Sequence, residues 1–195
     1  MMDVRDQLND RGARGPKAGT SASAPASSSA APNGTSPAAL DPDQFRSILG
    51  RFASGVTVVT AVDAGGRDHG MTVSAFCSVS LAPPLVLVCI DRDASMHELL
   101  HETTHFAVNI LSSRQEALSR RFSHPDADRF DGIGYARAAS GAPILDDVLA
   151  WLECRIVARH AAGDHTVIVG EAEAGESGGE RPLLYYRGGY AALER

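Results

Sequence analysis

The sequence has few cysteines, few aromatic residues and no long apolar run. Of its 195 residues, three are cysteine and 6% are aromatic, and the longest uninterrupted apolar run extends only from Leu85 to Ile90. A membrane-spanning helix needs about 20 predominantly apolar residues, so we expect no membrane segment. The formal net charge is -6 and no stretch rich in lysine and arginine is present. Because nucleic-acid binding needs a clustered basic surface, we expect no nucleic-acid partner.

The three cysteines are Cys77, Cys89 and Cys154, and they contain no C-x-x-C pair. Each lies within an apolar stretch, which predicts buried free thiols in a reducing compartment. The first 40 residues contain no apolar segment of the kind found in secretory signals. Both observations predict a cytoplasmic protein.

The N-terminal segment differs sharply in composition from the rest of the chain. Between Arg11 and Leu40, 25 of 30 residues are Gly, Ala, Ser, Thr or Pro. Such a segment cannot bury enough apolar surface to offset the entropy cost of ordering it. We therefore expect a disordered tail over residues 1–40 and one folded domain over residues 41–195, a size typical of a single domain.

The folded part is predicted to be rich in strands. Asp41 and Pro42 form a helix-start pattern, followed by apolar residues at helical spacing from Phe45 to Phe52. The remaining expected elements are strands at 56–62, 67–81, 85–90, 105–111, 149–160, 166–174 and 183–190, helices at 95–101 and 113–122, and an irregular loop at 123–140. We expect Ser95 to cap the second helix and strand 85–90, which is wholly apolar, to be central and buried on both faces. Strands joined by only short helices predict a mainly β fold, a β-barrel with short peripheral helices.

The segment from Met71 to Leu81 alternates in an unusual way. The residues at odd positions are apolar (Met71, Val73, Ala75, Cys77, Val79, Leu81), whereas those at even positions mostly carry hydroxyl groups (Thr72, Ser74, Phe76, Ser78, Ser80). Small hydroxyls without charge suit a surface on which a flat polar ligand lies against the backbone. An ordinary exposed strand face rich in Ser and Thr explains the pattern equally well.

Eight segments, in order along the chain, resemble the short-chain flavin reductases that supply two-component monooxygenases. They are 55–60 (GVTVVT), 70–90 (GMTVSAFCSVSLAPPLVLVCI), 106–111 (FAVNIL), 118–122 (LSRRF), 128–130 (DRF), 152–155 (LECR), 163–165 (GDH) and 182–186 (PLLYY). The resemblance extends over residues 43 to 193. It implies an FMN-binding split barrel, a homodimer with flavin near the subunit interface, and transfer of hydride from NADH or NADPH to flavin that is released to a separate oxygenase.

The resemblance also implies particular site residues. The flavin-binding set would be Gly70, Thr72, Ser74, Ala75, Cys89, Asp91, Ser95, Met96, Asn109, Arg121, Phe122 and Tyr190. The first four would line the flavin ring, the helix start at Ser95 would meet the phosphate region, and Arg121 would pair with phosphate. His165 would lie on the nicotinamide side and orient the hydride donor, or it would be a turn histidine bonded to backbone. FAD and FMN, and NADH and NADPH, stay open as alternatives.

Other chemistries are less well supported by the sequence. His97, His101 and His105 are spaced four residues apart, but we expect the helix to end before His105 and therefore predict no metal site. The sequence has no G-x-S-x-G, no Rossmann G-x-G-x-x-G after a strand and no P-loop. The main alternative to a reductase is a flavin- or haem-binding split barrel that senses or stores its ligand without catalysis. A third is an oxidoreductase that keeps its flavin bound and acts on an organic substrate.

Overall fold

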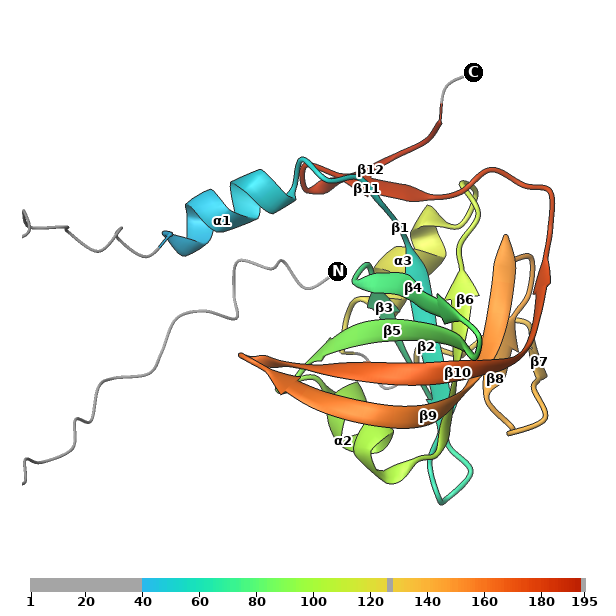
Figure 1. Ribbon diagram of the computed structural model, residues 1–195. Coiled ribbons are helices and arrows are strands. Elements are labelled where there is room, and N and C mark those ends of the chain that lie inside the picture. Colours follow the sequence, from blue (N-terminus) through green and yellow to red (C-terminus); the bar gives the residue numbers. More distant parts are fainter. Residues whose placement is uncertain (1–39, 126–127, 194–195) are drawn as a thin grey trace, which may run out of the picture.

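A computed structural model describes residues 40–125 and 128–193 (Figure 1). The expected tail lies outside the described residues, apart from Leu40. The elements are α1 (Pro42–Leu49), β1 (Ser54–Gly55), β2 (Thr57–Val62), β3 (Asp68–Val73), β4 (Phe76–Leu81), β5 (Pro84–Asp91), α2 (Ser95–Glu102), β6 (His105–Ile110), α3 (Glu116–Phe122), β7 (Tyr135–Arg137), β8 (Pro143–Leu145), β9 (Ala150–Ala162), β10 (His165–Ser177), β11 (Leu184–Tyr186) and β12 (Gly189–Ala191). The predicted mainly β fold with short helices is confirmed. No described helix is long and apolar enough to cross a membrane.

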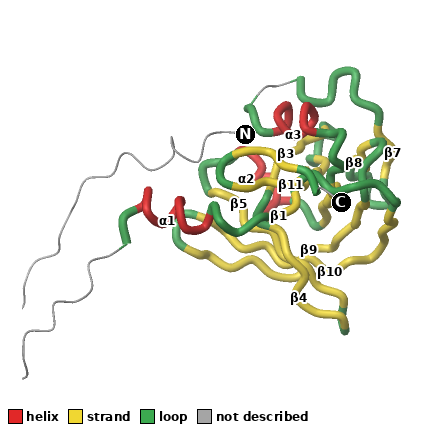
Figure 2. Tube along the Cα trace, turned by 90° about the horizontal axis from the view of Figure 1, so that it is seen from above, coloured by secondary structure: helices red, strands yellow, loops and turns green. Residues whose placement is uncertain are grey.

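A curved antiparallel sheet dominates the fold (Figures 1 and 2). Its seven strands follow the order β3-β2-β6-β9-β10-β5-β4. Its concave side encloses a core to which six of the strands and helix α2 contribute buried side chains, among them Val59, Val88, Leu100, Phe106 and Ile168. Because side chains alternate across a strand, each strand supplies every second residue to this core. The sheet therefore wraps around one apolar interior in the manner of a barrel.

A second apolar cluster lies on the other side of β2, under α3. It contains Val56, Val58, Leu111, Phe122, Leu145 and Leu183. Both faces of β2 are therefore covered, and its first five residues are all buried. Helix α3 and the C-terminal strands are held against the barrel by this cluster.

The predicted long strand at 67–81 is wrong, because the chain breaks at Ser74 and Ala75. β3 pairs with β2 at one edge of the sheet, and β4 pairs with β5 at the other. The chain crosses between the two edges at the break, which shifts the alternation by one residue. Val73 and Phe76 both pack against the barrel core, whereas Cys77 is exposed. The continuous apolar parity read from the sequence therefore does not form one buried face.

Several smaller expectations also need correction. Strand β5 lies next to the edge of the sheet and is buried on alternate residues only, so it is neither central nor buried on both faces. The N-cap of α2 is Ala94 and not Ser95, which is the first helical residue. Helix α3 starts at Glu116, and the expected loop at 123–140 contains β7, which pairs with β8. Of the three cysteines only Cys154 is buried.

The beginning and end of the described chain meet at one end of the barrel. Strand β1 pairs with β11, which forms a hairpin with β12. The predicted start of α1 is confirmed: the Asp41 side chain accepts a hydrogen bond from the Gln44 N–H, and Pro42 occupies the first turn. The apolar face of α1 is not buried against any described part of the chain, since none of its residues is buried.

Candidate active site

Most of the candidate residues fall into two groups, and Met96 and Asn109 belong to neither. The first group, which we call the rim, comprises Ser74, Ala75, Cys89, Asp91, Ser95 and His165, at the end of β5 and the start of β10. The second, the α3 end, comprises Gly70, Thr72, Arg121, Phe122 and Tyr190 around helix α3. Ser74 and Ala75 connect the two groups, because they follow β3 directly and precede β4. Asn109 lies apart from both.

The rim is built by pairing of β5 with its neighbours. His165 lies opposite Asp91 in the β5–β10 ladder. The Cys89 N–H donates to the Ala75 carbonyl at 3.0 Å, which continues the β4–β5 pairing up to the strand break. Residues that are directly opposite or two apart on a strand share one face of the sheet. Cys89, Asp91 and His165 therefore share the outer face of the barrel, with Ala75 beside them.

The turn between β5 and α2 is shaped by Asp91. Its carboxylate accepts from the Asp93 N–H at 2.8 Å, and its carbonyl accepts from the Ala94 N–H. Helix α2 then begins without a side-chain cap, and Ser95, its first residue, is exposed. Met96 points the other way and is buried in the barrel core. The start of α2 thus presents a hydroxyl and first-turn amides, donors that suit an anion.

His165 is half-exposed and held by its neighbour in sequence. Its Nδ1 lies 2.8 Å from an Asp164 carboxylate oxygen, and this contact lowers the pKa of Asp164. The Asp164 carbonyl accepts from the Arg92 N–H, which ties the β9–β10 turn to the β5–α2 turn. A carboxylate bonded to Nδ1 leaves Nε2 as the ring nitrogen available to a ligand.

Cys89 is unsuited to act as a nucleophile. Burial, and to a smaller extent the neighbouring Cys77, raises the pKa of its thiol. The thiolate is the reactive form of cysteine, so Cys89 stays a protonated, weakly polar side chain at neutral pH. At the rim it offers an apolar contact surface.

The α3 end is closely packed. A Cβ atom on Gly70 would come within 2.6 Å of the buried Phe122 ring, so only glycine fits there. The Thr72 hydroxyl donates to the Ser119 carbonyl at 2.7 Å, and the Ser119 hydroxyl lies 2.8 Å from the Tyr190 hydroxyl. These bonds join β3, α3 and β12. The side chains that the sequence led us to place around a ligand are here engaged with one another.

The side chains of Arg121 and Asn109 both form hydrogen bonds with backbone groups. The Arg121 guanidinium donates to the carbonyls of Asp128 and Asp131. Asn109 is fully buried, where its Nδ2 donates to the Val58 carbonyl and its Oδ1 accepts from the Leu145 N–H. Buried polar groups need such partners, and these bonds fix β8 against the sheet. Asn109 therefore has a structural environment, away from the rim.

The sequence analysis assigned no role in the site to Ser119, Arg120 or Asp164. Ser119 is buried and links Thr72 to Tyr190, and the Arg120 guanidinium carbon lies 4.7 Å from the centre of the Tyr190 ring. Ser119 and Arg120 both precede the predicted Arg121 and Phe122, but nothing in one sequence shows which of four successive helical residues faces the C-terminal hairpin. Asp164 was visible as part of the Gly163–His165 segment.

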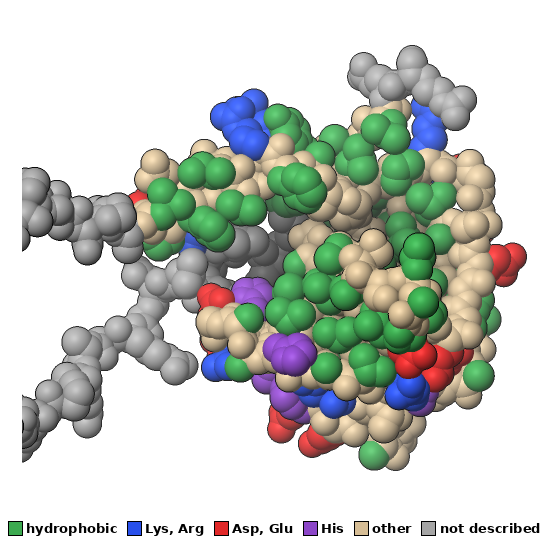
Figure 3. Space-filling model, viewed as in Figure 1, with side chains coloured by type: hydrophobic (Ala, Val, Ile, Leu, Met, Phe, Trp, Pro, Cys, Tyr) green, Lys and Arg blue, Asp and Glu red, His purple; other side chains and the backbone are tan. Residues whose placement is uncertain are grey.

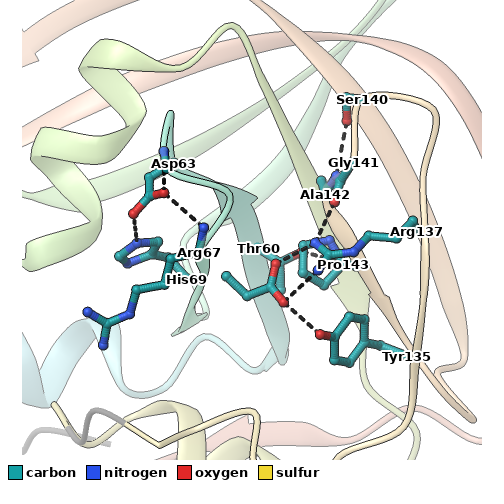
Figure 4. Close-up of polar contacts among 12 residues, drawn as sticks. Thr60, Asp63, Arg67, His69, Tyr135, Arg137, Ser140, Gly141, Ala142 and Pro143 are labelled. Atoms are coloured by element: carbon teal, nitrogen blue, oxygen red, sulfur yellow. Dashed lines mark hydrogen bonds and ion pairs between the residues drawn. The ribbon is translucent and has the colours of Figure 1, made fainter.

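A polar network below β3 lies outside the candidate site (Figure 4). The His69 Nε2 lies 2.9 Å from an Asp63 carboxylate oxygen, a contact that lowers the pKa of Asp63. The Tyr135 hydroxyl donates to Asp68 at 2.7 Å, which raises the pKa of Tyr135, and Arg137 pairs with the same carboxylate. These contacts join the β2–β3 hairpin to β7 and form a self-contained structural network.

The histidines considered for metal binding do not form a triad. His97 and His101 lie side by side on α2, with ring centres 4.6 Å apart, but His105 begins β6 and contacts Glu173. Over residues 40–125 and 128–193, no three His, Cys, Asp or Glu side chains are grouped so that they could hold a metal ion.

Comparisons with known proteins identify the family. Residues 49–194 match the family model described as flavin reductase like domain. The chain is 45% identical over 159 residues to the flavin reductase (NADH) of Kitasatospora aureofaciens, which covers 80% of this chain and 83% of that protein. It is 38% identical over 157 residues to a flavin-dependent monooxygenase reductase subunit of Rhodococcus jostii, covering 80% of each.

A solved structure agrees with these matches. The Streptomyces globisporus NADH:FAD oxidoreductase, determined in complex with NAD and FAD fragments, superimposes with a TM-score of 0.76 at 37% identity and covers 79% of this chain and 93% of that chain. Some relatives are longer: the chain spans 49% of one Rhizobium meliloti protein at 44% identity, and 66% of the stachydrine N-demethylase reductase subunit of the same organism at 45% identity. By sequence and by structure, this chain belongs to the flavin reductase-like domain family.

Proposed function

We propose that this chain is a flavin reductase that transfers hydride from NADH or NADPH to FAD or FMN and supplies the reduced flavin to a separate monooxygenase. The observation that carries the proposal is the rim, where small exposed residues, an uncapped helix start and a half-exposed histidine converge on one outer face. Relatives named as a flavin reductase (NADH) and as a monooxygenase reductase subunit support the same activity and the same kind of partner.

The residues at the rim fit a flavin. Ser74 and Ala75 are exposed at the strand break, where small side chains let a flat ring approach the backbone. The first turn of α2, beginning at Ser95, offers N–H donors to a phosphate, and Asp91 fixes the turn that leads into it. Gly70, Thr72, Phe122 and Tyr190 would support the ring from behind by holding β3 against α3. This fit does not distinguish FAD from FMN, because both share the ring and the first phosphate.

His165 is proposed to position the nicotinamide. Its contact with Asp164 holds the imidazole at the mouth of the rim opposite Asp91. A bound flavin would supply the hydride-accepting chemistry, so the contribution of the protein is to hold donor and acceptor in contact. His165 then acts as a positioning residue: with its Nδ1–H donating to Asp164, the Nε2 of the neutral ring accepts a hydrogen bond from a ligand N–H or O–H. We assign it no proton transfer.

The apolar surface beside the rim supports a homodimer. The outer face of β4, β5 and β10 carries Cys77, Leu87 and Val169 in one row, because Cys77 pairs with Leu87 and Leu87 with Val169. Hydrophobic side chains gather on this side of the barrel (Figure 3). A contiguous apolar surface on a protein of this size is typical of an interaction site. We propose that a second copy covers it, and that the flavin lies near this interface.

We also propose a cytoplasmic location and a single folded domain that begins at residue 41. All three cysteines are free thiols, as expected in a reducing compartment. The partner monooxygenase is defined here only by its chemistry: it consumes reduced flavin together with oxygen.

The activity is tested by following NADH absorbance with purified protein and excess FAD or FMN. We expect NADH oxidation well above that of a control without protein. The result that contradicts the proposal is no turnover with either flavin and either nicotinamide. Retention of flavin through gel filtration without NADH oxidation would instead identify a non-catalytic binding barrel. Bleaching of bound flavin only after an organic substrate is added would identify a substrate-specific oxidoreductase.

A further inference from the structure

Among the described residues, seven large apolar side chains are at least half exposed, and all of them except Leu193 lie on two separate elements. Helix α1 and the segment after it expose Phe45, Ile48, Leu49 and Phe52, with 53%, 52%, 50% and 78% of their surface accessible. Strand β4 exposes Val79 and Leu81, at 50% and 95%, and Cys77. The β4–β5 register shifts between Ser78 and Ser80, so these three side chains do not lie on one regular strand face. We call residues 41–52 the arm and the exposed residues Cys77, Val79 and Leu81 of β4 the ribbon. Neither surface has a partner among the described residues.

The arm cannot be stable without a cover. It contains a helix of 8 residues, and isolated helices shorter than about 12 residues are marginal in water. Its apolar side chains recur at three- and four-residue spacing on one face, while Asp43 and Ser47 lie on the other. The sequence thus encodes an amphipathic helix whose apolar face has no cover among the described residues.

The C-terminal end of the arm is fixed so that the helix points away from its own barrel. The Arg187 N–H donates to the Gly50 carbonyl at 2.9 Å, and the Val56 N–H donates to the Leu183 carbonyl at 3.1 Å. These bonds fix the end of the arm to the β11–β12 hairpin. Both ribbon views show α1 extending outward from this point (Figures 1 and 2).

The ribbon is an edge that needs protection. Strand β4 is the last strand of the sheet, and an exposed apolar edge strand is prone to pair with other chains. Residues 11–39 are a poor cover, because they contain no large aliphatic or aromatic residue. A cover for the ribbon must come from a more apolar segment, and the arm is such a segment.

We propose that the arm is exchanged between two copies of this chain: each arm packs on the ribbon of the partner, next to the rim. A twofold dimer matches both surfaces at once, since each copy carries one arm and one ribbon. Phe45 and Phe52 together expose on the order of 250 Å², taking about 200 Å² for a phenylalanine side chain. The other exposed residues bring the total towards the roughly 800 Å² per partner of a standard interface.

The exchange makes the flavin site dependent on the partner. Cys77 lies on the same outer face as Cys89, because it pairs with Leu87, two residues before Cys89. An arm on the ribbon therefore borders the rim and closes one side of the proposed site. This inference rests on the homodimer of the proposed function, but its test does not use reductase activity, so failure of one is distinguishable from failure of the other.

Cys77 provides the readout, because it is exposed in the protomer and would be covered by the arm. We would measure maleimide labelling of Cys77 by peptide mapping, and oligomeric state by sedimentation, for the wild-type protein and the double variant Phe45→Glu/Phe52→Glu. We expect a wild-type dimer in which Cys77 reacts about tenfold more slowly than in the variant. Ser47→Glu, on the opposite face of α1, is the matched control and should behave like wild type.

The variant should stay folded because none of the residues of α1 is buried in the protomer, and an unchanged circular dichroism spectrum with cooperative thermal unfolding of the monomeric variant checks this. A monomeric wild type overturns the proposal. So does a dimer in which Cys77 is equally reactive in wild type and variant, since the arm is then not its cover.

Mixed dimers distinguish an arm that packs on the partner chain from an arm that folds back onto its own chain. One chain carries Phe45→Glu/Phe52→Glu and keeps Cys77, and the other keeps its arm and carries Cys77→Ser. If the arm is exchanged, Cys77 of the first chain becomes protected on mixing, because the intact arm of the partner covers it. If Cys77 stays reactive in the mixed dimer, the arm acts within its own chain or elsewhere, and the proposal is wrong.

Discussion

The two ends of the candidate site are built in opposite ways. At the α3 end, Gly70 touches the Phe122 ring and Thr72 is bonded to Ser119, so the contacts of these residues are with the protein itself. At the rim, Ser74 and Ala75 are exposed, and His165 keeps one ring nitrogen free of its Asp164 contact. Both groups belong to segments that carry the same resemblance in sequence, yet the side chains of only one group are largely exposed.

This difference distinguishes residues that hold the protein together from residues that are exposed where a ligand would bind. A residue whose groups are already satisfied inside the protein affects a ligand by holding the backbone in place, and its replacement acts first on stability. A residue at the open rim affects binding and leaves stability almost unchanged. The following predictions test this division, beginning with the change that we expect to cost the most.

Gly70→Ala should destabilise the protein most. The new Cβ would lie 2.6 Å from the fully buried Phe122 ring, so the ring or the strand must shift. Overpacking of this kind costs about 1–3 kcal/mol. Denaturant unfolding with and without flavin measures it. If Gly70→Ala kept full stability and lost only flavin affinity, Gly70 would belong with the rim and the division would be wrong.

Thr72→Val should have a smaller effect. The substitution keeps the shape of the side chain but removes the donor to the Ser119 carbonyl, which costs about 1 kcal/mol. Thr72→Ser retains the hydroxyl and serves as the control. Equal stability of the valine and wild-type proteins would show that the hydrogen bond to Ser119 is not needed to join β3 to α3.

His165→Asn should change stability by less than about 0.5 kcal/mol, because the side chain is half-exposed and lies at the first residue of β10. We expect it to raise the KM for NADH several-fold while flavin affinity changes little. Steady-state kinetics and flavin titration by fluorescence measure the two effects. The reverse pattern, with weakened flavin and unchanged KM, would place His165 on the flavin side.

The smallest effect concerns His97, beneath the rim. Burial, then the neighbouring His101 and Arg92, lowers the pKa of His97 below its ordinary value, while its Nε2 lies 2.9 Å from the Thr166 hydroxyl. The unfolded chain therefore binds the proton more readily, and stability falls as the pH drops through about 6.5.

His97→Gln should remove part of that fall. We expect a difference in Tm of about 1–2 °C between neutral pH and about pH 5, measured against wild type. His160→Gln, on an exposed histidine of β9, is the control. A pH profile unchanged by His97→Gln would show that His97 is not the group responsible.

Local features were predictable from the sequence because they depend on neighbours in the chain. Asp41 caps α1 and Pro42 occupies its first turn, as predicted, since both roles are decided within four residues. The β9–β10 hairpin was likewise expected from two apolar segments around a Gly-Asp turn. Its strands are longer than predicted, because the ladder continues into residues that carry charge.

Features decided by distant pairing were not predictable in the same way. Nothing between Met71 and Leu81 shows that β3 joins β2 while β4 joins β5, so the break at Ser74 could not be read from the alternation. Asn109 was placed in the flavin-binding set by the resemblance alone. Its partners, the Val58 carbonyl and the Leu145 N–H, come from segments far from it in sequence. Whether a polar residue serves a ligand or the fold depends on such distant neighbours.

The pairing of β1 with β11 has a consequence for synthesis of the protein. Ser54 and Gly55 find their partners at Tyr185 and Leu184, about 130 residues later in the chain. The ribosome must therefore synthesise the chain past Tyr185 before the first strand can be completed. Until then the cluster under α3 lacks Leu183, and the nascent chain exposes apolar surface that chaperones recognise.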